Sequence, residues 1–205
     1  MNIAWILLYT LITNGLEIVI FFKVDGIDLT FERIFKAFLL KFLLGAIFAT
    51  FQFLAVSEYL SYFIEPLFGI GLSFLLLRGL PKKLLFFYGL FPMILVNLFY
   101  RGVSYFVLPF LGQGQVYDSY SFIWLCIMIF NFFISLVFLK WLDYDFTSLR
   151  REILDKDFQK SLTKINWIMG AYYLVIQSLS YFEYEQGIQS TTVRHLILVF
   201  YLLFF

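Results

Sequence analysis

The sequence predicts an all-α protein, a polytopic bundle of transmembrane helices, on three observations. Of its 205 residues, 62% are hydrophobic and 14% are charged, whereas a soluble domain has about 45–50% apolar and about 25% charged residues. The apolar residues form long runs, several of which reach the roughly 20 residues that a helix needs to cross a bilayer. The basic residues gather in alternate connections between these runs. We therefore expect a multi-pass protein of the cell membrane.

Six of the apolar runs are long enough to be full spans. They lie near residues 3–22, 34–57, 59–80, 84–108, 121–142 and 165–182. The first run has no Lys or Arg before it and no small-residue cleavage site, so we interpret it as a span rather than a signal peptide. A seventh run, 196–205, would extend only about 15 Å as a helix, half of the hydrocarbon thickness. We interpret residues 1–205 as one transmembrane sensor domain whose seventh span is incomplete and whose continuation lies beyond residue 205.

Basic residues orient the chain, because cytoplasmic loops are enriched in Lys and Arg. Of the 15 basic residues, all but Arg101 and Arg194 fall in the first, third and fifth connections or their flanks. These are Lys23, Arg33, Lys36, Lys41, Arg78, Lys82, Lys83, Lys140, Arg150, Arg151, Lys156, Lys160 and Lys164. The N-terminus is therefore predicted to lie outside the cell, with these three connections inside.

Several function classes are excluded by composition and motifs. A net charge of +1 leaves no basic excess for nucleic acid. With Cys126 and His195 as the sole residues of their types, the chain has no disulfide framework and no Cys/His metal site. The HExxH, GxSxG and phosphate-loop motifs are absent from the sequence, so we expect neither enzymatic activity nor a cofactor.

Acidic residues on the predicted outer side are the first ligand-binding candidates. Glu58, Asp118, Glu183 and Glu185 oppose only Arg101 and Arg194 there, which would weakly favour a cationic ligand. The alternative is that they are solvated loop charges.

Ionisable residues within the spans are the second group of candidates, since such residues are costly and often functional. Glu65 and Arg101 are expected near the outer surface, and Glu17 and Lys41 at similar depth near the cytoplasmic side, where they can form an ion pair. Pro66 and Pro92 each remove a backbone donor and can kink a helix. The alternative for both charged pairs is a structural ion bridge, with Lys41 extending to the interface.

Two further segments suggest local structure. Within the connection 143–164, the residues Phe146, Leu149, Ile153 and Leu162 can share one helical face. This pattern suggests a basic amphipathic helix on anionic headgroups, with a solvated linker as the alternative. Gly69 belongs to a small-residue patch that suits close helix packing.

Three stretches of the chain resemble a known family. They are MNIAWILLYT at 1–10, FKVDGIDLTFER at 22–33 and FQKSLTKINWIMG at 158–170. They resemble the membrane half of the streptococcal peptide-pheromone receptor histidine kinases, the BlpH type related to ComD and AgrC. The resemblance implies a receptor module of a two-component quorum-sensing system that senses a secreted bacteriocin-like peptide, forms a homodimer and reaches a response regulator through a kinase domain.

The sequence departs from this family in the part that would carry the chemistry. His195 lies in VRHLI, on the predicted outer side, and does not match the phosphoacceptor pattern of the family. The ATP-binding boxes are missing as well. We therefore expect this chain to be no enzyme itself. The alternatives are a small polytopic permease or transport subunit, which would use the same buried charges as a substrate path, and an inactive truncated remnant.

Overall fold

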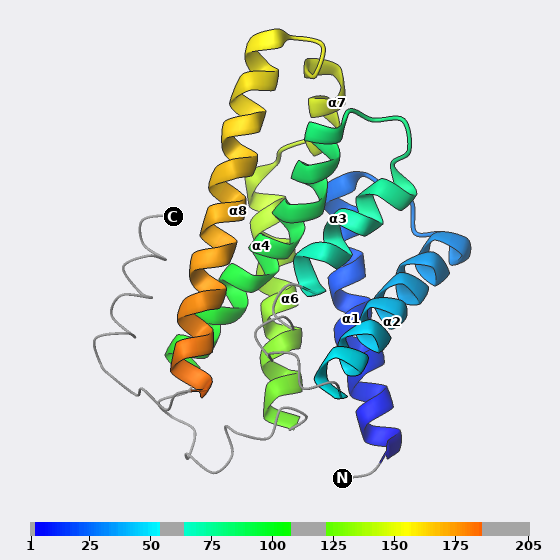
Figure 1. Ribbon diagram of the computed structural model, residues 1–205, viewed down its shortest axis with the longest axis vertical. Coiled ribbons are helices and arrows are strands. Elements are labelled where there is room, and N and C mark those ends of the chain that lie inside the picture. Colours follow the sequence, from blue (N-terminus) through cyan, green and yellow to red (C-terminus); the bar gives the residue numbers. More distant parts are fainter. Residues whose placement is uncertain (1–2, 54–63, 108–121, 186–205) are drawn as a thin grey trace.

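The computed structural model describes residues 3–53, 64–107 and 122–185 as an all-helical bundle (Figure 1). No strand occurs in these three ranges. Seven α-helices and one 3-10 helix, η3, account for the regular structure of the described residues. Their bounds are α1 Ile3–Asp25, α2 Phe31–Phe53, α3 Ile64–Leu76, α4 Lys82–Val107, α6 Phe122–Leu142, η3 Phe146–Ser148, α7 Leu149–Glu152 and α8 Lys156–Glu185.

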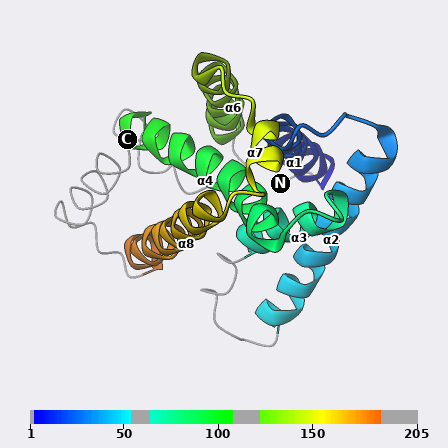
Figure 2. The same ribbon diagram turned by 90° about the horizontal axis from the view of Figure 1, so that it is seen from above.

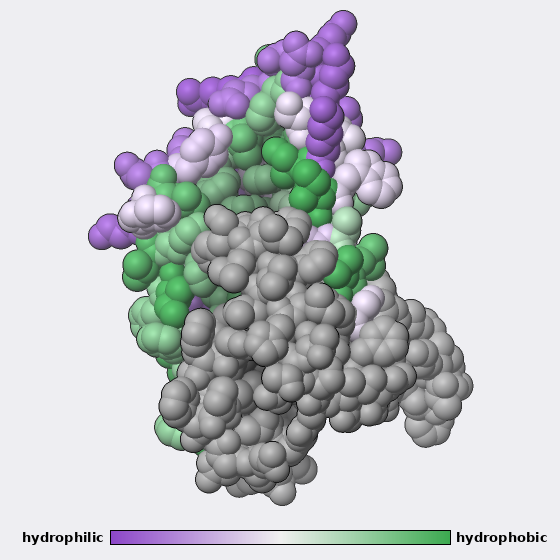
Figure 3. Space-filling view, turned by 90° about the vertical axis from the view of Figure 1, so that its left-hand side faces the viewer, coloured by the Kyte–Doolittle hydropathy of each residue, from purple (hydrophilic) through white to green (hydrophobic). Residues whose placement is uncertain are grey.

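The six longer helices alternate in direction along the bundle (Figure 1). The connections 26–30, 77–81 and 143–155 consequently meet at one end, which we call the polar end. Figure 3 shows hydrophilic side chains gathered at this end and hydrophobic ones below it. The structure therefore brings together the three connections that hold most of the basic residues.

Within the described residues, three helices are long and apolar enough to cross a membrane. The qualifying windows are Leu7–Asp25 in α1, Lys82–Phe99 in α4 and Leu125–Leu142 in α6. A shorter apolar helix, Pro66–Leu76, belongs to α3. The expectation of an all-helical chain with membrane-spanning character is confirmed for the described residues. The six full spans and the outer N-terminus remain predictions.

Helix α4 is the centre of the bundle. It packs against α1, α3, α6 and α8, whereas α2 packs chiefly against α3 at the edge (Figure 2). Close packing of α3 on α4 depends on two glycines, because a Cβ on Gly69 would lie 2.2 Å from the carbonyl oxygen of Gly89. The predicted role of Gly69 in close helix packing is confirmed.

The segment that leads into α8 differs from the predicted amphipathic helix. It divides into η3, α7 and the first turns of α8, and Leu149, Ile153 and Leu162 are buried in the hydrophobic core. The ring of Phe146 lies 5.0 Å from that of Phe91 on α4. The prediction that these side chains form a membrane-surface face was wrong, because the bundle itself offers the apolar partners that the headgroup region was expected to provide.

Candidate functional site

The first charged site lies between α1 and α2. The Lys41 ammonium contacts the Glu17 carboxylate, and both side chains are largely buried. The same ammonium lies 4.9 Å from the centre of the Phe68 ring on α3, a cation–π distance. The pairing expected from the depths of Glu17 and Lys41 is thus present, and it joins α1, α2 and α3 through one cation.

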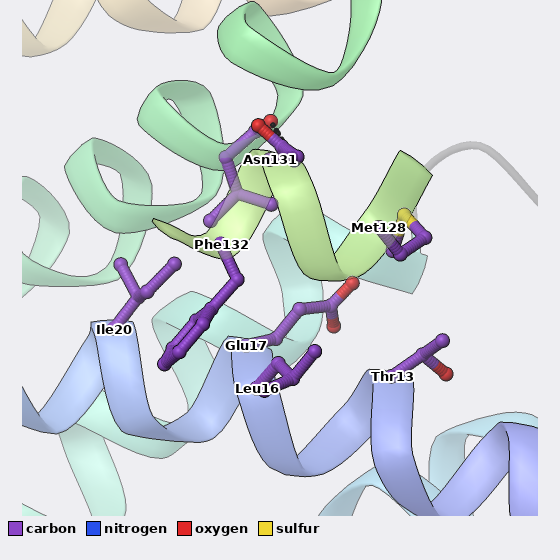
Figure 4. Close-up of a pocket in the computed structure, with 8 residues that line it drawn as sticks. Thr13, Leu16, Glu17, Ile20, Met128, Asn131 and Phe132 are labelled. Carbon is purple, nitrogen blue, oxygen red and sulfur yellow. Dashed lines mark hydrogen bonds between the residues drawn. The ribbon is translucent and has the colours of Figure 1, made fainter. Parts of the chain in front are cut away.

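A small cavity lies beside this ion pair, between α1, α4 and α6 (Figure 4). Its volume is about 10 Å³, close to the minimum that a single water molecule needs. The lining residues are Thr13, Leu16, Glu17, Ile20, Val96, Met128, Asn131 and Phe132. Most of them are apolar. In Figure 4 the Glu17 side chain extends from α1 toward α6, on which Met128 and Phe132 lie.

Asn131 contributes a buried amide to this region. Its Nδ2 donates to the carbonyl oxygen of Val96 at 3.1 Å, which ties α6 to α4. Its Oδ1 is buried and accepts no hydrogen bond from the described residues. Thr13 is already engaged, because its hydroxyl donates to the carbonyl of Tyr9 at 3.0 Å. We call Glu17, Lys41, Thr13 and Asn131 the interhelical polar site.

The second charged site lies at the polar end, where α1 meets the segment before α8. Asp25, the last residue of α1, is completely buried, and neither of its carboxylate oxygens has a hydrogen-bond donor among the described residues. No cation among the described residues lies within ion-pair distance of these oxygens, and the positive charge of Arg150 in α7 acts on them from farther away. Its guanidinium donates to the backbone carbonyl of Asp25 and lies 5.5 Å from the Tyr88 ring centre. We call Asp25, Arg150 and Tyr88 the polar-end junction.

Neighbouring contacts hold the junction in place. The hydroxyl of Tyr88 donates to the carbonyl of Phe146 at 2.6 Å, so a hydrogen bond joins α4 directly to η3. Gly26 has φ +60°, and a Cβ there would lie 2.3 Å from Cγ2 of Thr147. The turn after α1 therefore requires glycine for both its backbone conformation and its space.

Asp145 caps the short helix η3 at the start of this segment. Its carboxylate accepts hydrogen bonds from the backbone N–H of Thr147 at 2.9 Å and from the Thr147 hydroxyl at 2.6 Å. These bonds, with smaller effects of Arg151 and Arg150, hold the pKa of Asp145 below its ordinary value. The cap starts the local turn that presents Arg150 to Asp25.

The predicted outer ligand residues are not tested by this structure. Glu58 and Asp118 lie outside the described residues. Glu65 in α3, Arg101 in α4, and Glu183 and Glu185 in α8 have described backbones only, so their proposed pairing and ligand contacts remain predictions.

The prolines predicted to kink helices lie within α-helices. Pro66 occupies the third described position of α3, and α4 continues as a helix through Pro92. Pro92 has no N–H to donate to the carbonyl four residues earlier, which belongs to Tyr88. The junction residue Tyr88 therefore sits at the interrupted hydrogen bond of α4.

Sequence reasoning missed the polar-end junction. The first span was predicted to end near residue 22, which left Asp25 in the connection that follows it. Arg150 was predicted only to be one of several basic residues in the polar connection 143–164. One usable signal was present: Asp25 closely follows the apolar run 18–22 and directly precedes Gly26, so a carboxylate at a helix end was foreseeable. Its partner, 125 residues later, was not foreseeable from spacing. Groups of His, Cys, Asp and Glu suited to a metal ion do not occur within the described ranges.

Comparison with known proteins adds no family assignment. No family model, no curated protein and no solved structure matches this chain.

Proposed function

We propose that the chain is the membrane sensor module of a receptor histidine kinase that detects a secreted peptide pheromone. In this proposal the peptide binds at the outer side, the receptor acts as a homodimer, and the signal reaches a response regulator through a kinase domain. The support from sequence is the resemblance of residues 1–10, 22–33 and 158–170 to such receptors.

The structural observation that carries the proposal is that α1 holds a buried acidic residue in each of the two charged sites. Glu17 contacts α2 through Lys41, and Asp25 contacts α7 through Arg150. Eight residues separate the two carboxylates along one helix, a rise of about 12 Å at 1.5 Å per residue. A displacement of α1 would change both contacts together, so α1 is suited to transmit a change from the bundle interior to the polar end.

A ligand can drive such a displacement only if it binds the two arrangements with different affinity. The residues proposed for that contact are Glu58, Glu65, Arg101, Asp118, Glu183 and Glu185, with Pro66 and Pro92 as positions where α3 and α4 can bend. In the second arrangement the residues of the polar-end junction would form different contacts with one another. This change of contacts is the output of the module. The segment before α8 belongs to the end of the bundle that is predicted to lie inside, where the kinase domain would receive the change.

The packing around the interhelical polar site favours a receptor over a permease. Glu17 is engaged by Lys41, and the adjacent cavity has room for about one water molecule. A transport path would need these charges to line a passage for a substrate. They instead join helices to one another.

The test uses the chain reconstituted in nanodiscs and in proteoliposomes. A synthetic bacteriocin-like pheromone peptide is titrated against the nanodiscs, with binding followed by fluorescence anisotropy of a labelled peptide. We expect saturable binding that a scrambled peptide of the same composition does not show, and no peptide-independent flux across the proteoliposomes. Flux of solute without peptide binding would support the permease, and absence of both would support an inactive remnant.

A further inference from the structure

Two hydrogen-bond acceptors line the small cavity beside the Glu17–Lys41 ion pair. One of them belongs to Asn131 on α6, a residue that is 1% exposed. Its Nδ2 donates to the carbonyl oxygen of Val96, which can only accept, so this bond fixes which end of the amide carries the oxygen. That oxygen, Oδ1, accepts no hydrogen bond from the described residues. A buried carbonyl oxygen without a donor is costly, so a donor is expected beside it.

The second acceptor is the carboxylate of Glu17 on α1. Its side chain extends toward α6 and lines the same cavity (Figure 4). An ionised carboxylate has about four acceptor positions, so it can accept from the Lys41 ammonium and from another donor at the same time. A ligand that donates two hydrogen bonds can therefore satisfy Asn131 and also bind Glu17.

The charges around the cavity favour a neutral ligand. Glu17 is the sole ionisable residue among those that line the cavity, and Lys41 supplies the opposite charge. A cation in the cavity would be repelled by the nearby ammonium, and an anion by the carboxylate, in surroundings of low dielectric constant. Metal ions and charged solutes are therefore disfavoured as occupants.

The size of the cavity restricts the ligand further. Its volume of about 10 Å³ is close to the minimum for a single water molecule. Entirely apolar cavities in proteins stay dry, whereas a buried water molecule typically makes about two to four hydrogen bonds to polar groups. Water is the neutral molecule of this size that has two O–H donors, one for each of the two acceptors.

We propose that one water molecule binds in this cavity and joins α6 to α1. One of its O–H groups donates to Oδ1 of Asn131, and the other donates to the Glu17 carboxylate. The water completes a series of polar contacts that begins at Lys41 on α2 and ends at the carbonyl of Val96 on α4, so four helices share one network. Water-mediated hydrogen bonds are nearly as favourable as direct ones. This site is independent of the proposed sensor function, because neither the site nor its test involves the peptide.

The test measures whether water lies beside Ile20, a residue of α1 that lines the cavity. The chain is prepared in deuterated form with protonated isoleucine methyl groups and placed in nanodiscs of phosphatidylcholine. Magnetisation transfer from water to each methyl group is then followed by NMR. Ile18 is the matched control, because it lies on the same helix and is equally buried but does not line the cavity. We expect transfer to Ile20 to build up several-fold faster than transfer to Ile18.

Two variants identify the group that holds the water. Asn131→Leu replaces the acceptor by an apolar side chain of similar size and should reduce the transfer at Ile20 to the level of Ile18. Glu17 and Lys41 stay in place in this variant, so transfer relayed through the Lys41 ammonium would persist in it. Thr13→Val removes the other neutral polar group of the lining and should leave the fast transfer intact, because the Thr13 hydroxyl already donates to the Tyr9 carbonyl.

The unaltered chain gives the first decisive result, which does not depend on the folding of either variant. Equal transfer to Ile20 and Ile18 in the unaltered chain would overturn the proposal. Undiminished fast transfer in Asn131→Leu, or its loss in Thr13→Val, would also overturn it, because a group other than Asn131 would then hold the water.

Discussion

Replacement of Arg150 by Ala tests the polar-end junction most sharply. The change removes the hydrogen bond to the Asp25 carbonyl, the contact with the Tyr88 ring and the positive charge that acts on the Asp25 side chain from beyond ion-pair distance. The hydrogen bond and the ring contact together contribute about 1–2 kcal/mol, and the longer-range attraction between the half-buried guanidinium and the Asp25 side chain adds about 1 kcal/mol. The expected loss in the free energy of unfolding is therefore about 2–3 kcal/mol.

A double-mutant cycle with Asp25→Asn separates the charge from the other contacts. With a neutral amide at position 25, Arg150→Ala should cost only about 1–2 kcal/mol, for the hydrogen bond and the ring contact. Unfolding is followed by tryptophan fluorescence during titration of detergent-solubilised protein with sodium dodecyl sulfate. The adjacent, exposed Arg151 provides the matched control, because Arg151→Ala should change stability by less than about 0.5 kcal/mol. If Arg150→Ala costs the same with Asp and with Asn at position 25, the buried-charge argument is wrong.

Three further substitutions test local geometry. Gly69→Ala should destabilise the α3–α4 packing by about 2 kcal/mol or more, because the new Cβ would overlap backbone atoms of α4. Gly45→Ala on α2, where a new Cβ has no neighbour within 4 Å, should be neutral or stabilising in the same detergent titration. Equal effects of the two changes would refute the close-packing argument. Gly26→Ala should lower the free energy of unfolding by about 1–3 kcal/mol, through backbone strain and overlap of the new Cβ with Thr147. Adding Thr147→Ala should relieve the overlap but leave the strain. A double variant no more stable than Gly26→Ala alone would contradict this account. Thr147→Val should raise the pKa of Asp145 toward its ordinary value by removing the hydroxyl hydrogen bond, and carboxylate NMR titration can measure this pKa. Because the pKa is lowered in the folded state, the cap contributes stability above the unfolded pKa and loses it as pH falls through the folded pKa. An unshifted titration in the variant would show that the hydroxyl is not the cause.

The helices were predictable because their signal is local. Apolar runs long enough to cross a bilayer locate α1, α4 and α6 in the sequence, and the alternating basic connections anticipate that 26–30, 77–81 and 143–155 lie at one end. The Glu17–Lys41 contact was also predictable, because consecutive helices place residues at equal depth when their distances from the shared turn are equal. Depth arithmetic of this kind needs no knowledge of the tertiary packing.

The remainder depends on contacts that periodicity does not encode. The apolar face that contains Leu149 and Ile153 has the pattern of a membrane-surface helix, and only the position of α1 and α4 shows that it is buried in the bundle. Asp25 and Arg150 meet for the same reason. Asn166 and Lys83, whose hydrogen bond joins positions 83 residues apart, likewise meet only in the tertiary structure.

The most direct test of the proposed sensor measures whether peptide binding moves α1 relative to α7. Spin labels are attached at Lys23→Cys and Glu152→Cys in a Cys126→Ser background, and their separation in nanodiscs is measured by electron paramagnetic resonance with and without saturating pheromone peptide. A label pair at Lys156→Cys and Lys160→Cys, within α8, controls for local effects of the peptide. The account predicts a changed distance distribution between α1 and α7 and an unchanged one within α8. Identical α1–α7 distributions with and without bound peptide would contradict it.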